Sequence, residues 1–175
     1  MLFRSPKTVR DGSLLLGVEM LGFAEPDLLE AAARQRLEDA IASGRAARVF
    51  ERLIEAQGGD PRVVEDPSRL PQPRQTVPAR ASRSGYVRSI ATEQMGFLSI
   101  DIGCGRRRRE DTIDPAAGFL VEKTVGDRVE EGEPLAVLCL GERPAPRPGI
   151  EGELAALFEI GDEPVEPPPL AVERL

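Results

Sequence analysis

Four consecutive arginines, Arg106 to Arg109, form the densest cluster of charge in the sequence. Guanidinium groups pair well with phosphate oxygens, so the cluster could bind an anion or nucleic acid. However, Glu110, Asp111 and Asp114 follow at once and would neutralise it. We therefore interpret the cluster as a solvent-exposed loop whose arginines pair with nearby carboxylates, with anion binding as the alternative.

The segment Gly103-Cys104-Gly105, just before the arginines, has the composition of a phosphate-binding loop. Such a loop normally precedes a helix, whose N-terminal amides point at the anion. Here a helical pattern comes before the glycines rather than after them. We therefore interpret the segment as the C-terminal cap of that helix.

The remaining candidate groups are sparse. Cys104 and Cys139 are the two cysteines and the chain has no histidine, so a metal site is not expected and the thiols are interpreted as small buried apolar groups. The acidic run Glu130, Glu131 and Glu133 is typical of a solvated turn. No two carboxylates are placed as an acid–base pair, and the commonest general base is absent. We predict no catalytic, metal-binding or cofactor-binding residue in this chain.

A lysine near the pattern GDRVEEGEPL, residues 126–135, raises the question of a covalently attached cofactor. The pattern is similar to modules that carry biotin or lipoate on a lysine at an exposed hairpin tip. Lys123 is the nearest lysine, but it lies within a β-strand pattern. We therefore predict that no cofactor is attached.

Composition limits the classes of partner. The chain has 175 residues, 41% of them apolar but only 4% aromatic, and a net charge of −7. An acidic surface disfavours nucleic acid and anionic membranes. No apolar run approaches the roughly 20 residues that a membrane span needs. Two cysteines are too few for a disulfide framework, so we expect a reducing, cytoplasmic location.

A β-rich unit at residues 118–138 is the centre of the predicted fold. Two short apolar runs, 119–121 and 135–138, are separated by turn signals at Gly126 and Gly132, where a positive φ is expected. Val125, Val129 and Leu135 would fill the inside of the turn region. The unit resembles half of a small β-barrel.

Other segments would cover this unit. Helical periodicity predicts helices at residues 8–22, 26–43, 45–57, 91–102 and 149–158, the first of them buried on nearly all sides. Further strands are expected at 77–81, 85–90 and 170–174. An irregular, proline-rich connector occupies 61–78, and loops occupy 111–115, as an Asx turn, and 143–148. The fold class is α+β, with a helical segment and connector at 1–78 and a compact C-terminal domain at 79–175.

Several segments together resemble the C-terminal portion of the pyrimidine-nucleoside phosphorylases, the group that includes thymidine phosphorylase. They are LLLGVEML at 14–21, ASGRAARVFERLIEAQGGDPRVVEDPSRLP at 42–71, SGYVRSI at 84–90, GCGRRRREDTIDPAAGF at 103–119 and VGDRVEEGEPLAVL at 125–138. The resemblance covers most of the chain, in the order and spacing of the family.

The resemblance implies a fold and a reaction. Such enzymes have a small helical dimerisation domain and a large α/β domain, and they are homodimers. Phosphate attacks the anomeric carbon of a pyrimidine nucleoside in the cleft between the domains, giving free base and (deoxy)ribose 1-phosphate. The family's phosphate-binding and base-binding segments, and its dimerisation domain, have no counterpart here. We therefore expect a truncated chain that is inactive alone and whose partner is the missing N-terminal part.

Two residues depart from the family pattern. Asp11 stands where some members use Glu to bind a structural potassium ion, and the other ligands of that ion are absent. Ala91 stands where members tend to place Asp as a helix N-cap. The alternatives to a truncated enzyme are one half of a split phosphorylase and a free-standing, non-catalytic binding or regulatory module that uses the helix at 14–21.

Overall fold

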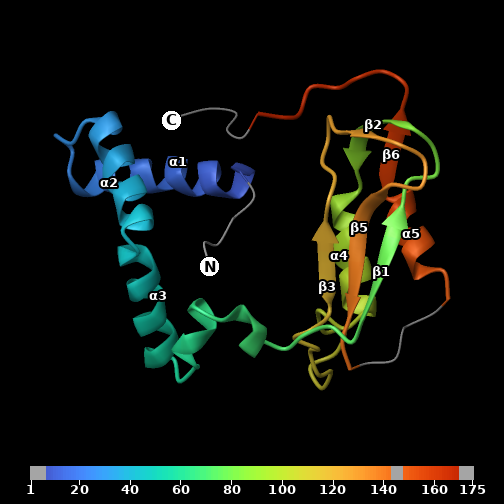
Figure 1. Ribbon diagram of the computed structural model, residues 1–175, viewed down its shortest axis with the longest axis horizontal. Helices are drawn as coiled ribbons and strands as arrows, with labels where there is room; N and C mark the ends of the chain where they lie inside the picture. Colours follow the sequence, from blue (N-terminus) through green and yellow to red (C-terminus); the bar gives the residue numbers. More distant parts are fainter. Residues whose placement is uncertain (1–6, 143–147, 170–175) are drawn as a thin grey trace. The chain divides into compact units, whose positions relative to one another are not determined.

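The structure of the protein is a computed structural model that describes residues 7–142 and 148–169. The chain divides into two compact units, the first ending at Arg69 and the second running from Leu70 to Pro169. The first unit is helical, and the second combines helices with two three-stranded sheets (Figure 1). The predicted α+β class is confirmed. The two sheets are open, so the term β-barrel describes them only loosely.

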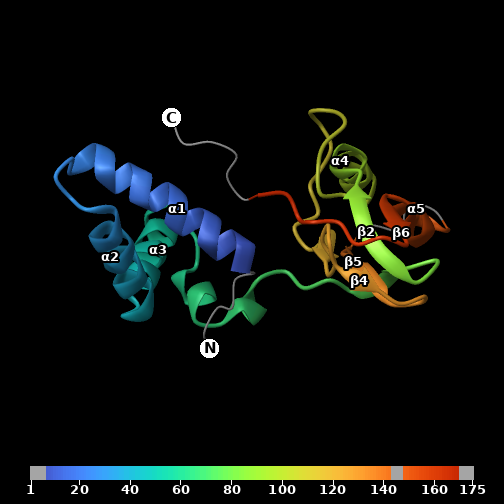
Figure 2. The same cartoon turned by 90° about the horizontal axis from the view of Figure 1, so that it is seen from above.

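Three helices and two short 3-10 turns make up the described part of the first unit. They are α1 (Lys7–Ala24), α2 (Glu30–Ala42), α3 (Arg45–Ala56), η1 (Pro61–Val64) and η2 (Pro67–Arg69). The axis of α1 crosses that of α2 (Figure 2). Gly17 permits this crossing, because a side chain there would meet Leu37 of α2.

The predicted start of the second helix is wrong. Residues 25–29 form a turn, in which the amide of Leu28 donates to the carbonyl of Glu25 at 2.9 Å, and the helix begins at Glu30. Pro26 and Asp27 thus belong to the turn, although both suit a first helical turn. The residue that precedes the helix, Leu29, has an extended backbone and provides no side-chain cap.

The expectation that the first helix is buried on nearly all sides is also wrong. Leu14 and Val18 are buried, but Leu16 and Met20 have exposed fractions of 63% and 71%. A single stripe of α1 therefore meets the rest of the unit, and the other apolar side chains of the helix face solvent.

The second unit is built on two antiparallel sheets. The first has the order β1 (Gln75–Arg80), β5 (Pro134–Leu140) and β3 (Gly118–Val121), and the second has β4 (Arg128–Val129), β2 (Gly85–Ile90) and β6 (Phe158–Gly161). Figure 1 shows β5 between the two other strands of its sheet. The three pairs in register that define this sheet's centre are Val77 with Leu138, Ala79 with Ala136, and Leu120 with Val137.

The predicted β-rich unit at residues 118–138 is confirmed, and it also contains a strand that pairs with the second sheet. Its two apolar runs pair as β3 and β5, and Gly126 and Gly132 have φ values of 95° and 81°. Between them, β4 pairs with β2, with Val129 opposite Gly85, so this segment joins the two sheets. Val129 and Leu135 are fully buried, as expected for residues that fill the turn region, whereas Val125 is only half-buried.

Two helices complete the second unit, namely α4 (Thr92–Asp101) and α5 (Ile150–Ala156). The last helix is shorter than predicted, because Phe158 begins β6 and pairs with Ile90 of β2. The core of the unit is aliphatic apart from this phenylalanine. Its buried members are Ala79, Ala81, Val87, Leu98, Ile102, Val129, Leu135, Ala136, Leu138, Leu140, Ile150, Leu154 and Phe158.

Two predictions cannot be compared with the structure in full. The strand expected at 170–174 and most of the loop expected at 143–148 lie outside the described residues. Among the helices that the structure describes, none is long and apolar enough to cross a lipid bilayer.

Candidate functional site

A groove of about 700 Å³ lies on the second unit. It lies where three segments meet: the connector before β1, the loop before β3, and the residue after β5. The residues that line it are Pro71, Gln72, Arg74, Thr112, Ile113, Asp114, Pro115, Ala116 and Glu142. Its one described ion pair joins Arg74 and Glu142 across 2.7 Å, which links the connector to the end of β5.

Asp114 lines this groove and is buried, with an exposed fraction of only 7%. The amide of Ala116 donates to Oδ1 at 3.0 Å, and the amide of Glu142 donates to Oδ2 at 2.7 Å. The amide of Asp114 itself donates to the carbonyl of Gly103 at 2.9 Å. The predicted Asx turn is confirmed. The carboxylate also links this loop to the segment after β5, and the Asp114 amide links it to Gly103.

Both carboxylate oxygens of Asp114 accept hydrogen bonds from backbone amides, a role that the sequence did not predict beside its expected neutralisation of the arginine cluster. Gly141 makes this possible, because a methyl group there would overlap Oδ1 of Asp114. The signal for this role was the glycine directly after the last residue of the β5 pattern.

The arginine cluster lies on an exposed loop, as predicted. The guanidinium of Arg107 pairs with Asp101 at the end of α4. Asp111 acts differently, because its Oδ2 accepts the backbone amides of Arg107 and Arg108 at 2.9 Å each. The loop is therefore shaped by carboxylates, one through an ion pair and one through backbone hydrogen bonds.

The segment 103–105 is a helix cap, as predicted. Gly103 has a φ of 106°, and its amide donates to the carbonyl of Ile100 at 3.1 Å. The amide of Cys104 donates to the carbonyl of Ser99 at 3.0 Å. This pair of bonds is a Schellman motif, which satisfies the last carbonyls of α4. The amides of Gly103 and Cys104 are therefore occupied and do not cradle an anion.

The cysteines behave as small apolar residues. Both are free, Cys139 is buried in β5 and Cys104 is half-buried. Burial raises the pKa of each thiol, so both favour the protonated form, which is a poor nucleophile and a poor metal ligand. Within residues 7–142 and 148–169, no three His, Cys, Asp or Glu side chains are grouped so that they could hold a metal ion.

Lys123 is bonded within its own hairpin. Its Nζ lies 2.5 Å from Oε1 of Glu133, and its amide donates to the carbonyl of Leu135 at 3.1 Å. The hydrogen bond from Lys123 lowers the pKa of Glu133, which favours the ionised form of this carboxylate. Glu130 accepts a hydrogen bond from Ser84, so the acidic run is more structured than a solvated turn.

Asp11 is occupied by a neighbour on the same helix. Lys7 donates to its Oδ2 at 2.8 Å, and this hydrogen bond lowers the pKa of Asp11. The pair is exposed and spans one helical turn. The structure thus places an ammonium group at the carboxylate that the family resemblance associated with potassium.

Comparison with known proteins agrees with the resemblance noted from the sequence. Residues 86–144 match the family described as pyrimidine nucleoside phosphorylase C-terminal domain. This segment spans the hairpin unit, the arginine loop and Asp114, so the groove described above is largely built from it.

Individual relatives extend the match over nearly the whole chain. Pyrimidine-nucleoside phosphorylase of Geobacillus stearothermophilus is 34% identical over 170 residues, which cover 97% of this chain and 39% of that enzyme. The Bacillus subtilis enzyme is 37% identical, over 88% of this chain and 34% of its own length. The Staphylococcus aureus enzyme is 38% identical, over 77% and 31%.

The chain therefore spans between 31% and 39% of the length of these relatives. On the family match and these identities, the chain belongs to the pyrimidine-nucleoside phosphorylase family and corresponds to the C-terminal portion of its members.

Proposed function

We propose that this chain serves as the C-terminal portion of a pyrimidine-nucleoside phosphorylase in the cytoplasm. The reaction of the assembled enzyme would be the cleavage of a pyrimidine nucleoside by phosphate to free base and (deoxy)ribose 1-phosphate. The observation that carries the proposal is the match of 97% of this chain to 39% of a pyrimidine-nucleoside phosphorylase.

We further propose that the chain does not catalyse this reaction alone. Phosphorolysis requires groups that hold a dianionic phosphate and stabilise a departing base. In the described groove of the second unit, the one arginine is paired with Glu142, and the carboxylate of Asp114 is committed to backbone amides. This arrangement supports a scaffold rather than a complete active site.

Two measurements test the proposal. The purified chain should release no thymine or uracil when it is incubated with thymidine or uridine and phosphate. A chimera, in which this chain replaces the matched portion of the G. stearothermophilus enzyme, should catalyse phosphorolysis. Turnover by the chain alone, or a folded chimera without activity, would contradict the proposal.

A free-standing binding module is the second candidate, and one observation favours it. The helix α1 exposes Leu16, Met20 and Phe23, the last with an exposed fraction of 85%. Such a surface is typical of a contact with another polypeptide. Tight one-to-one capture of a separate phosphorylase N-terminal chain that restores activity would indicate a split enzyme, whereas capture without activity would favour a regulatory module.

A further inference from the structure

The arginine loop, defined here as residues 105–113, lies between α4 and β3 and contains neither helix nor strand. The cap of α4 holds one end of the loop, and the buried Asp114 holds the other. Between these two anchors no residue is buried, and residues 106–110 are all exposed. The tip of the loop can therefore open without exposing the core of the second unit.

The tip is held in its folded form by polar contacts. Oδ2 of Asp111 accepts the amides of Arg107 and Arg108 at 2.9 Å each, and the amide of Asp111 donates to the carbonyl of Arg108 at 3.1 Å. The guanidinium of Arg107 pairs with Asp101. Such contacts contribute little to stability near solvent, because water offers the same groups replacement hydrogen bonds. Opening of the tip therefore costs much less free energy than opening of the strands.

A loop tip of this kind has the features of a protease substrate. Proteolytic nicking concentrates at exposed loop tips, where the chain can be drawn out into the protease. Serine proteases that carry a carboxylate in the pocket for the side chain before the cleaved bond select a basic residue there. The four successive arginines at 106–109 offer that side chain at four bonds.

Three of the four bonds have a disadvantage. The bond after Arg106 is the nearest to the cap of α4, which would have to open as well. The side chain of Arg107 is already paired with Asp101. The bond after Arg109 is followed by Glu110, whose negative charge would repel the oxyanion that forms during cleavage.

The bond between Arg108 and Arg109 has none of these disadvantages. It lies near the middle of the arginine loop, away from both anchors. Within residues 7–142 and 148–169, Arg108 forms no ion pair, so its guanidinium is available to the pocket of a protease. This bond is therefore the favoured point of cleavage.

A cut at this bond would not separate the second unit into two bodies. The part before the bond contributes β1, β2 and α4, and the part after it contributes β3, β4, β5, α5 and β6. Since β1 pairs with β5, and β2 pairs with β4 and β6, each sheet contains strands from both parts. The core is shared in the same way, with Val87 and Leu98 from the first part and Leu135 and Leu154 from the second.

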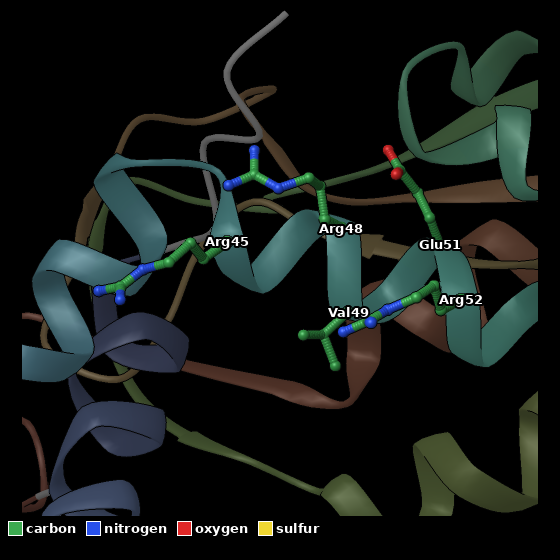
Figure 3. Close-up of a pocket in the computed structure, with 5 residues that line it drawn as sticks. All are labelled: Arg45, Arg48, Val49, Glu51 and Arg52. Carbon is green, nitrogen blue, oxygen red and sulfur yellow. The ribbon is translucent and has the colours of Figure 1, made fainter.

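Exposure of an arginine side chain is not sufficient for such a site, as α3 shows. Arg45, Arg48 and Arg52 are exposed and line a hollow of about 450 Å³ along this helix (Figure 3). Their peptide bonds belong to the helix, which must unwind before a protease can bind the chain. In the second unit, Arg83 is also exposed, but it lies in the short turn between β1 and β2.

We propose that the arginine loop is a processing site for serine proteases of arginine specificity, which hydrolyse the bond between Arg108 and Arg109 and leave the second unit assembled. In this reaction the carbonyl carbon of Arg108 loses its bond to the nitrogen of Arg109 and gains the hydroxyl group of a water molecule. The remaining proton of the water goes to the new amino group. The cleavage is independent of phosphorolysis, so its test stands apart from that of the proposed function.

Brief digestion of the full chain with trypsin under native conditions, followed by mass spectrometry, tests the site. Among the bonds of residues 70–169, the one between Arg108 and Arg109 should be cut first and at least about tenfold faster than any other, because the tip opens at small cost. The comparison is confined to the second unit, since the first has few buried apolar side chains and opens more easily. Native mass spectrometry should find the two parts of the cut second unit bound to each other.

Two variants and a matched control test the role of the loop. Arg108→Gln should abolish cleavage at this bond. Asp111→Ala should accelerate cleavage at least about twofold, because it removes the acceptor of two amide hydrogen bonds that hold the tip. Arg83→Gln is the control, since it removes an exposed arginine from the turn between β1 and β2, and it should leave the rate unchanged.

Three results would overturn the proposal. The first is an initial cleavage at any other bond of residues 70–169. The second is separation of the two parts after the cut, with loss of the circular dichroism signal of the intact chain. The third is an Asp111→Ala variant that is cut no faster than the unsubstituted chain.

Discussion

Asp114 shows how one carboxylate can organise a loop cluster. It accepts hydrogen bonds from the amides of Ala116 and Glu142, which belong to segments on opposite sides of β5 in the sequence. A buried carboxylate is stable only when such donors replace its hydration. The neighbouring Gly141 leaves the space that this carboxylate occupies. Asp114 and Gly141 therefore act together: the glycine leaves the space, and the carboxylate holds the loops.

Replacing Gly141→Ala should disrupt the hydrogen bonds of the Asp114 carboxylate. The added methyl group would displace the Asp114 carboxylate from its two amide donors. The free energy of unfolding should fall by about 3 kcal/mol, from overpacking and from unsatisfied polar groups. Urea unfolding of the full chain would measure it. Gly118→Ala is the control, since nothing lies within 4 Å of the added atom, and it should have little effect. Equal free energies of unfolding for the Gly141→Ala variant and the unsubstituted chain would show that the loop accommodates the methyl group without cost.

The N-terminus of α4 offers a stabilising change. Ala91 occupies the N-cap position with a non-helical backbone, φ −76° and ψ 74°, and makes no side-chain cap. Ala91→Asp should raise the free energy of unfolding by about 1 kcal/mol, because the carboxylate can accept a free amide of the first turn. Ala91→Asn should give a similar gain if the hydrogen bond, rather than charge, is responsible. A loss of stability in both variants would contradict the expected cap.

At the scale of elements, local signals predicted most helices and strands. Glycines with a positive φ, namely Gly44, Gly103 and Gly126, lie at the helix ends and the turn where the sequence predicted them. The strand β2 has the bounds that the sequence indicated. The start of α2 was misplaced, because an ordinary turn hydrogen bond between Leu28 and Glu25 competes with a proline-led helix start.

The other errors arose from tertiary contacts. β6 was missed, because its four residues form a strand only by pairing with β2, and no local pattern distinguishes them from a helix end. The exposure of α1 could not be read from its composition either, since the apolar count is the same whether or not a partner covers it. For the groove, the sequence predicted the Asx turn. It did not predict the hydrogen bond that the Asp114 carboxylate accepts from the amide of Glu142, which follows β5.

The contacts of Asp60, in the connector after α3, should make the free energy of unfolding decrease at acid pH. Asp60 caps η1 through the amide of Arg62 and pairs with the guanidinium groups of Arg62 and Arg69. These contacts, the Arg62 hydrogen bond first, hold the pKa of Asp60 well below its ordinary value of 3.8. The stability that they contribute is therefore complete above that ordinary value and is lost as the pH falls below it.

Thermal unfolding of the full chain between pH 7 and pH 3 would measure this dependence. Asp60→Asn keeps a capping oxygen but removes the charge, so this variant should lose less stability than the unsubstituted chain as the pH is lowered. The effect should weaken at high salt, because the pairs are exposed. An identical pH profile for the two proteins would show that the Asp60 contacts contribute nothing measurable.

At the scale of the whole molecule, the two units differ in how they are held together. The second unit has a continuous aliphatic core that both sheets, α4 and α5 contribute to. Among the described residues of the first, a short stripe between α1 and α2 is buried, and α3 has no buried residue. This contrast agrees with the family match, which lies entirely within the second unit, at residues 86–144.

A polypeptide of residues 70–169 should consequently fold alone, with a cooperative thermal transition and slowly exchanging amides in β1, β2 and β5. A polypeptide of residues 1–69 should be helical but melt without a sharp transition, because its described part buries few apolar groups. Circular dichroism and calorimetry of the two fragments would compare them. A cooperative transition in the shorter fragment would show that the first unit has a sufficient core.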